Sequence, residues 1–154
     1  MKKLGILIVL LALSFSTYAQ KIKIKKGTVY VNKKEFLKID REFANETVTS
    51  LDDEVIFIIK YYSFDKPNPA RNNTNDPNRF KYPAMIKQHY SVISFLDFDL
   101  KYETNLTRKK LFKAMYKYKL MTKDNKVSEN SARKIGELIS KEISGNIPVV
   151  IYTN

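Results

Sequence analysis

Residues 21–39 read KIKIKKGTVYVNKKEFLKI, and this stretch indicates a fold more clearly than any other part of the chain. Lysine and isoleucine alternate over 21–25, which is the two-residue period of a strand with one buried and one solvated face. Gly27 and Asn32 separate this strand from two further β-prone runs, so we expect tight turns at both positions. The stretch therefore predicts an antiparallel β-meander, whose first strand carries lysines that protect its edge.

Two longer segments continue the β pattern, at 47–62 and at 90–102. The first predicts a hairpin around Asp52-Asp53, and its second half, Val55-Ile56-Phe57-Ile58-Ile59, is apolar on both faces, as in a central strand. Residues 63–84 hold four of the five prolines and little that could be buried. We expect a long loop there, which is either functional or disordered.

After Asn105 the apolar residues recur with a helical period, which predicts a basic first helix over 107–120. Ser128 is a suitable N-cap for a second helix, which we expect to stop at Gly145. The predicted inner face of this second helix comprises Ala132, Ile135, Leu138, Ile139 and Ile143. Because strands come first and helices last, the sequence predicts an α+β fold, with a meander of about five or six strands followed by two C-terminal helices.

Residues 1–19 have the features of an export signal. Two lysines precede an apolar run over 4–15, and small residues stand before the bond that follows Ala19. The run is too short for a membrane anchor, and a chain without cysteine offers no site for a lipid. We expect cleavage after Ala19, a single exported domain over 20–154 that is periplasmic or secreted, and no integral membrane segment in the mature chain.

Four pieces of the chain together carry a resemblance to a known group of proteins. They are a signal ending in Ala19-Gln20, the stretch quoted above, the strand SVISFLDFDLKYE and the segment RKKLFKAMYKYKLMTKDNKVSENSARKIGELISKE. With these pieces the chain resembles uncharacterised small exported proteins of Bacteroidota. The resemblance implies export and a β-meander followed by two helices, and it implies no catalytic residues. The family pattern ends within the second helix, whereas this chain continues over 148–154.

The positive charge is concentrated in two segments. Residues 21–38 carry seven Lys and one Glu, and residues 107–126 carry eight Lys or Arg and one Asp. The predicted first helix presents cations at its start, where the helix dipole disfavours them, and a ladder of like charges along one face. These candidate anion-binding residues are Arg108, Lys109, Lys110, Lys113 and Lys117. The helix could bind a polyanion, or it could simply present a solvated basic face.

Few residues could carry catalysis. His89 is the only histidine and there is no cysteine, so we predict no Ser/His or Cys/His nucleophile, no metal site and no cofactor. Asp97 and Asp99 alternate along a predicted strand, which would set their side chains about 6–7 Å apart, within the range of paired catalytic carboxylates. They could equally form the solvated face of that strand. Asp52-Asp53-Glu54 fits a hairpin turn better than a calcium loop.

Aromatic residues gather around the predicted loop and could line a partner groove, stack on a sugar or pack into the core. The candidate ligand-binding residues among them are Tyr61, Tyr62, Phe64, Phe80 and Tyr82. The leading hypothesis is a non-enzymatic exported domain that binds an extracytoplasmic protein or glycan through the 63–84 loop. The alternatives are a hydrolase that uses Asp97 and Asp99, and a surface protein that binds polyanions through the basic helix.

Overall fold

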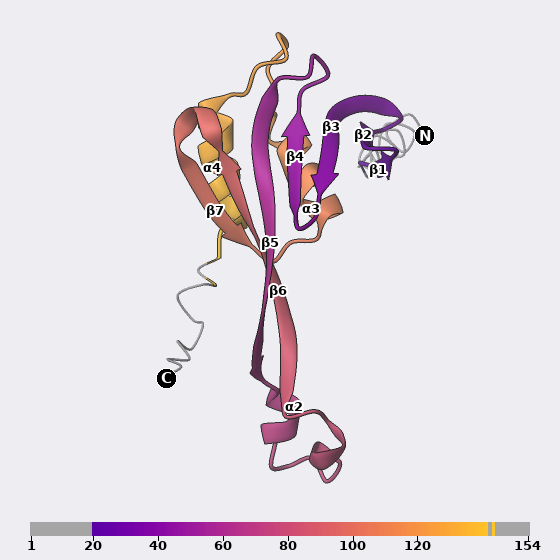
Figure 1. The fold of residues 1–154 in the computed structure, drawn as a ribbon, viewed down its shortest axis with the longest axis vertical. Helices are drawn as coiled ribbons and strands as arrows, with labels where there is room; N and C mark the ends of the chain where they lie inside the picture. The colour runs from indigo at the N-terminus through magenta and orange to yellow at the C-terminus, as the bar shows by residue number, and fades with distance from the viewer. Residues whose placement is uncertain (1–19, 142, 144–154) are drawn as a thin grey trace, which may run out of the picture.

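The computed structural model describes residues 20–141 and 143. Seven strands form one antiparallel sheet in which every strand neighbours the next in the chain, and helices follow the sheet (Figure 1). The strands are β1 (Ile22–Lys25), β2 (Thr28–Val31), β3 (Lys34–Glu42), β4 (Asn45–Thr49), β5 (Val55–Pro67), β6 (Met85–Phe95) and β7 (Leu100–Thr104). The predicted α+β class and β-meander are confirmed, with more strands than the five or six expected.

The first two turns form where the sequence predicted them. Lys26 and Gly27 have φ values of 48° and 76°, and Asn32 and Lys33 have φ values of 51° and 72°. Two successive positive φ values are the geometry of a type I′ turn, whose twist matches that of the strands it joins. At the first turn the Ile39 amide donates to the Gly27 carbonyl oxygen at 2.6 Å, and a Cβ on Gly27 would lie 2.9 Å from the Ile39 oxygen. Glycine is therefore required there.

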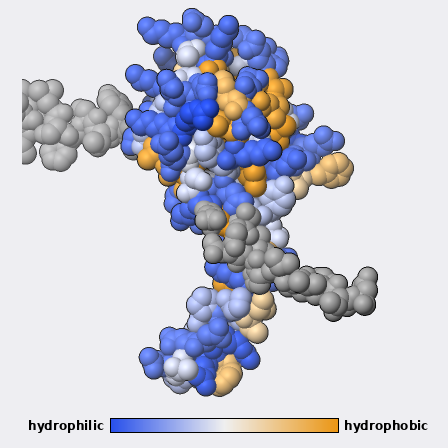
Figure 2. Space-filling model, turned by 90° about the vertical axis from the view of Figure 1, so that its left-hand side faces the viewer, coloured by the Kyte–Doolittle hydropathy of each residue, from blue (hydrophilic) through white to orange (hydrophobic). Residues whose placement is uncertain are grey.

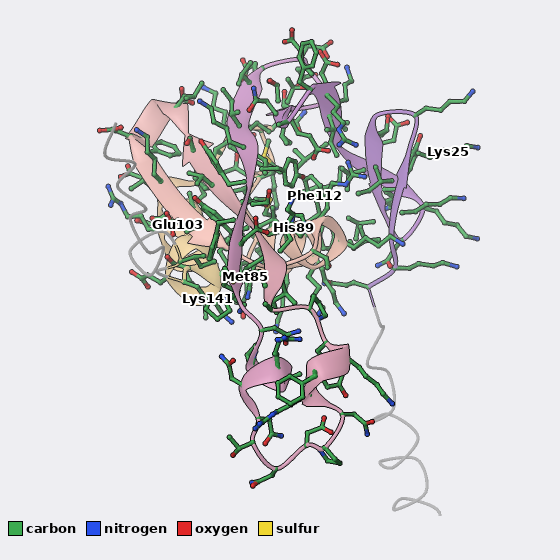
Figure 3. The ribbon with its side chains drawn as sticks, turned by 60° about the horizontal axis from the view of Figure 1, so that its bottom comes forward. Lys25, Met85, His89, Glu103, Phe112 and Lys141 are labelled. Atoms are coloured by element: carbon green, nitrogen blue, oxygen red, sulfur yellow. The ribbon has the colours of Figure 1, made fainter. Side chains whose placement is uncertain are left out.

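One face of the sheet packs on two helices, α3 (Arg108–Lys117) and α4 (Glu129–Ile139). Phe57 on β5 lies between Phe95 and Phe112, with ring centroids 5.3 and 6.5 Å away. All three rings are essentially inaccessible to solvent, and each such burial contributes about 1.5–3 kcal/mol to folding. The core, part of which is visible around Phe112 in Figure 3, thus lies between the middle strands and the helices. As predicted, β5 is an interior strand.

The second helix starts as predicted and ends early. The Ser128 hydroxyl accepts a hydrogen bond from the Ser131 amide at 3.3 Å, which is N-cap geometry. The helix ends at Ile139, and Leu138 is 55% exposed, so its assignment to the inner face is wrong. The chain then turns toward Glu103 on β7, whose carbonyl and carboxylate oxygens accept hydrogen bonds from the amides of Lys141 and Ile143.

Ile143 is buried, as predicted, but it lies beyond the helix. One of the two bonds to Glu103 reaches a backbone carbonyl on the free edge of β7, and the other reaches the side chain. The predicted signal over 1–19, the stop at Gly145 and the tail over 148–154 fall outside the described residues.

The segment over 63–84 is not one long loop, which corrects the prediction. Strand β4 pairs with β5 only as far as Lys60, and β7 pairs with β6 only from Ser91, but β5 and β6 continue to pair with each other as far as Pro67 and Met85. Residues 62–67 and 85–90 therefore form a two-stranded stem that projects from the sheet (Figure 1). We call this stem, together with the tip over 68–84, the arm.

Candidate functional site

The tip of the arm is held together by polar contacts rather than by a core. It contains the short helices α2 (Pro69–Asn72) and η1 (Arg79–Lys81). Asn68 is 7% exposed; its side chain accepts from the Ala70 amide and donates to the Pro83 carbonyl, both at 3.0 Å. The Arg71 guanidinium donates to the carbonyl oxygens of Phe80 and Tyr82 at 3.0 and 2.9 Å. The prolines and asparagines of the tip therefore form a defined structure.

Phe80 is the most exposed aromatic side chain of the tip, with 68% of its surface accessible. The guanidinium carbons of Arg71 and Arg79 lie 5.5 and 4.7 Å from the centre of its ring, within the range of cation–π contacts. A phenyl ring that contacts two arginines and is open to solvent has the composition of a protein-interface hot spot, where aromatic residues and arginine are enriched.

The stem also exposes apolar and aromatic surface. Tyr62 and Met85 are 44% and 48% exposed, and the Tyr62 ring stacks on Tyr90 across the two strands, with centroids 5.3 Å apart. Phe64 meets Tyr90 edge to face at 6.1 Å. In Figure 2 hydrophobic colouring appears both along the arm and at its far end, with hydrophilic residues around it. The rings stabilise a hairpin that has no other strand beside it.

Of the five predicted ligand-binding residues, Tyr62 and Phe64 lie on the stem, and Phe80 and Tyr82 lie at the tip. Tyr61 does not join them, because successive residues of a strand point to opposite faces. Its hydroxyl points toward the helices and donates to the buried Glu46 carboxylate at 2.8 Å. The sequence patterns did not indicate Met85 as part of this surface.

A second candidate site lies where the arm joins the body. We call it the root pocket, a cavity of about 310 Å³ lined by Tyr61, Tyr62, His89, Tyr90, Ser91, Asn105, Leu106, Thr107 and Arg108. Figure 3 shows His89 at this junction, with Met85 further along the arm. The pocket thus collects residues from two strands, a loop and the first residue of α3.

A buried ionic network supports one wall of the root pocket. Glu46 is 1% exposed, on the side of the sheet that faces the helices, and forms an ion pair with Arg108. Burial raises the pKa of Tyr61, and its hydrogen bond to Glu46 raises it further, while Arg108 and Arg41 act in the opposite direction. Burial likewise raises the pKa of Tyr90, with smaller contributions from Glu103 and Tyr62. Both phenols are therefore neutral over the physiological pH range.

The predicted anion-binding residues divide into two groups. Arg108 is engaged with Glu46, whereas the four lysines, Lys109, Lys110, Lys113 and Lys117, are exposed along α3. The far end of α3 reaches the first strands, where Tyr116 meets Phe36 edge to face at 5.2 Å. The two basic segments of the sequence are therefore neighbours in space.

Asp97 and Asp99 do not lie on a strand. Residues Leu96–Phe98 form the short helix η2, and Asp99 follows it in the left-handed conformation, with φ of 48°. The chain thus turns between β6 and β7, and the predicted strand over 90–102 is interrupted there. Asp97 borders a small hollow beside Glu54 and Lys126, and Asp99 is not part of its lining. The strand predicted at Asp97 and Asp99, on which the hydrolase alternative depended, is therefore wrong.

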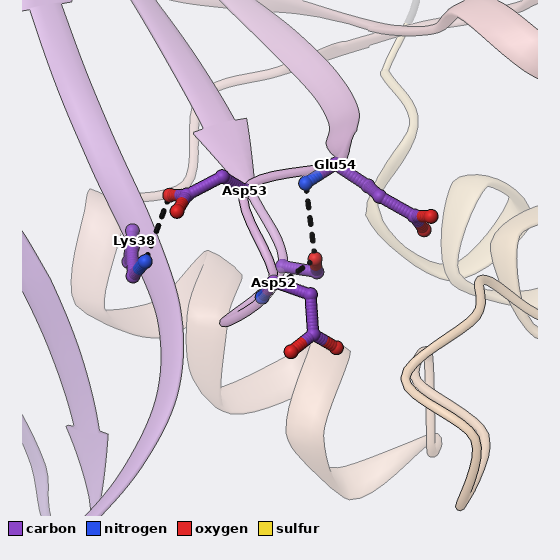
Figure 4. A network of polar contacts seen from close by, with 5 residues as sticks. Lys38, Asp52, Asp53 and Glu54 are labelled. Atoms are coloured by element: carbon purple, nitrogen blue, oxygen red, sulfur yellow. Dashed lines mark hydrogen bonds and ion pairs between the residues drawn. The ribbon is translucent and has the colours of Figure 1, made fainter.

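Asp52, Asp53 and Glu54 form the hairpin turn that the sequence predicted. The Ser50 hydroxyl accepts hydrogen bonds from the amides of Asp52 and Glu54 at 3.1 and 3.2 Å (Figure 4). Lys38 forms an ion pair with Asp53 at 2.7 Å. Within residues 20–141 and 143 there is no group of three or more His, Cys, Asp or Glu side chains that could hold a metal ion.

No protein-family model matches the chain, and no curated protein and no solved structure matches it either. In the part of the chain that the structure describes, no helix has the length and apolar character needed to cross a membrane.

Proposed function

We propose that this protein is an exported binding domain and that the arm engages a partner protein outside the cytoplasm. The observation that carries the proposal is the exposed Phe80 ring at the end of the arm, between Arg71 and Arg79. The Phe80 ring does not pack in the core of its own chain, because a stem about 20 Å long separates the tip from the sheet. Side chains in such positions are typical of docking sites.

The partner surface is expected to be acidic around an apolar pocket. Residues 62–90 carry five Lys or Arg and two Asp, so the arm is positively charged. Charge complementarity increases the rate of encounter, and an aromatic anchor supplies most of the affinity once water has been excluded. The defined structure of the tip reduces the conformational entropy that binding would otherwise cost.

The test is site-specific crosslinking in the native cells. A photoreactive phenylalanine analogue at Phe80 should give one discrete protein adduct, and the same analogue at Leu138 should not, because that exposed side chain belongs to the body. Arg71→Ala, which removes two hydrogen bonds of the tip, should reduce the adduct. A heterogeneous adduct resistant to protease would indicate a glycan instead, and identical adducts from the two positions would refute a role for the arm.

We propose polyanion binding as the second candidate, because α3 places its lysines next to those of β1. Lys117 and Lys119 share a hollow with Gln20, at the start of the first strand. The face of β1 and β2 away from the helices adds Lys21, Lys23, Lys25 and Lys33 around Tyr30, and Figure 3 shows Lys25 extending from this hairpin. The lysines of both basic segments thus lie on neighbouring elements, α3 and the β1–β2 hairpin.

Salt dependence of DNA binding tests this candidate. Replacing Lys109, Lys113 and Lys117 by Gln should flatten the dependence of log K on log salt by about one unit for each lysine that contacts phosphate. The control is the same change at three exposed lysines elsewhere on the molecule, Lys60, Lys87 and Lys101. Equal losses from the two triple variants would show that binding follows net charge alone, without a site.

A further inference from the structure

The root pocket has the size of a small-molecule site. Its volume of about 310 Å³ lies at the lower end of the range for ligand pockets, about 300–1,000 Å³. Tyr61 and Leu106 provide apolar surface, and the polar groups come from Ser91, Thr107 and Arg108. Apolar walls with a few converging polar groups are the usual composition of such sites.

Ser91 gives the pocket a polar group without a partner. This residue is 6% exposed, and its hydroxyl forms no hydrogen bond with another group within 20–141 and 143. The only fully buried side-chain polar atom without a partner in these residues is Oε1 of Gln20, so the Ser91 hydroxyl remains accessible to solvent from the pocket. Its neighbour across the sheet, Thr104, differs, because the Thr104 hydroxyl accepts from the Leu106 amide at 3.2 Å. Because Ser91 lines the pocket and its hydroxyl has no partner among the described residues, the hydroxyl is available to a ligand.

The charges around the pocket favour an anion. Helix α3 begins at its wall, Thr107 makes no capping hydrogen bond with its side chain, and the first turn contains no acidic residue. The first amides of a helix lack intrahelical acceptors and carry a partial positive charge. Arg108 adds a guanidinium, and only one of its nitrogens is used in the ion pair with Glu46. Arg and a helix start are both suited to oxyanion recognition.

We propose that the root pocket binds a small organic anion through its carboxylate or phosphate group. The Ser91 hydroxyl, the Arg108 guanidinium and the amides at the start of α3 bind the oxyanion, and Tyr61 and Leu106 contact its organic part. Carboxylate and phosphate share this chemistry, since each presents negatively charged oxygens to N–H and O–H donors. The proposal does not depend on the function of the arm, because none of these residues belongs to the tip.

The test is an NMR titration of protein purified from cells that express the full chain. Benzoate and phenyl phosphate are the probes, with chloride at equal ionic strength as the reference. The amides of Ser91, Leu106 and Arg108 should shift saturably, and the stronger of the two probes identifies the oxyanion. Ser91→Ala should weaken binding about tenfold, as expected for the loss of a hydrogen bond to a charged group.

Ser94→Ala is the matched control, because Ser94 lies on the same strand with its side chain on the other face of the sheet. Arg108→Lys provides a second variant that keeps a cation beside Glu46 and loses the planar fork, and it should also weaken binding. Ser91→Ala removes a hydroxyl without a partner, so its melting temperature should not fall. Shifts that fail to saturate, or equal affinities of the Ser91 and Ser94 variants, would overturn the proposal.

Discussion

Replacing Arg108 with Gln should be one of the most destabilising single changes outside the apolar core. Arg108 neutralises Glu46, whose side chain is 1% exposed, so the variant leaves a buried carboxylate without an ion pair. Removing one partner of a buried pair costs about 3–5 kcal/mol. The free energy of unfolding of a domain is about 5–15 kcal/mol, so this loss is a large fraction of the total stability.

Replacing Glu46 with Gln should cost less than replacing Arg108, because the two partners are buried to different degrees. The Arg108 side chain is 38% exposed and can turn its charge toward water when Glu46 is replaced by Gln. The amide oxygen of that Gln can still accept from Tyr61, so we expect a loss of about 1–2 kcal/mol. In the double variant neither charge remains, and its stability should return close to that of Glu46→Gln.

The assay is equilibrium unfolding in urea followed by circular dichroism, on the four members of this cycle and on Lys109→Gln. Lys109 is the exposed neighbour of Arg108, and its replacement should change stability by no more than about 0.5 kcal/mol. At about 4 °C per kcal/mol, Arg108→Gln should melt about 12–20 °C lower than the wild type. The reasoning fails if Arg108→Gln is as mild as Lys109→Gln, or if Glu46→Gln is the costlier single change.

Four further outcomes are expected. Burial and the bond to Glu46 raise the pKa of Tyr61 in the folded state, so wild-type stability should fall above about pH 10, where the unfolded tyrosine ionises. Below that pH, Tyr61→Phe should cost about 1 kcal/mol, and the difference should shrink as pH rises; urea unfolding that shows a constant difference up to pH 11 would contradict this. A Cβ on Gly136 would lie 2.1 Å from Cζ of Tyr102, so Gly136→Ala should destabilise by about 1–3 kcal/mol, whereas a rise in melting temperature would mean that helix propensity outweighs the clash. Arg71→Ala should speed tryptic cleavage in the tip about fivefold to tenfold, with Lys66→Gln as control, and an unchanged rate would show that the two carbonyl contacts do not stabilise it. Mass spectrometry of exported protein should find Gln20 as the first residue, and retention of residues 1–19 would contradict the export signal.

The local patterns predicted the strands and turns that depend on neighbouring residues. The first strand follows from the two-residue period of the side chains over 21–25, and the turn at Lys26-Gly27 follows from the positive φ that these residues adopt. Both features are present in the structure. The same alternation misled at Asp97 and Asp99, because two polar residues with one residue between them also fit a short helix followed by a left-handed residue. Leu138 was assigned to the inner face of α4, but it lies about 100° from Ile139 around the helix axis, and its side chain is exposed.

Local sequence patterns could not predict the arm and the root pocket, because the residues that contact one another there are distant in sequence. Tyr62 and Tyr90 pair across a hairpin, and this pairing extends both strands into a segment whose prolines and asparagines indicated a loop. Glu46 and Arg108 are 62 residues apart, and nothing around Glu46 distinguishes it from a solvated strand residue. The one sequence signal was indirect, because three cations at the start of a helix, without an acid, are disfavoured by the helix dipole.

The structure of the stem explains how an isolated hairpin can carry a binding surface. Two-stranded hairpins are only marginally stable by themselves, and among the described residues no further strand pairs with this one beyond Tyr61 and Ser91. Its first cross-strand layer is the stacked pair Tyr62 and Tyr90, and Tyr90 is 9% exposed although it lies on the arm. On the opposite face Tyr61 is fixed by Glu46, and Glu46 by Arg108. The stem thus extends a strand pair that is anchored on both faces, and a tip on such a support loses little entropy when it binds.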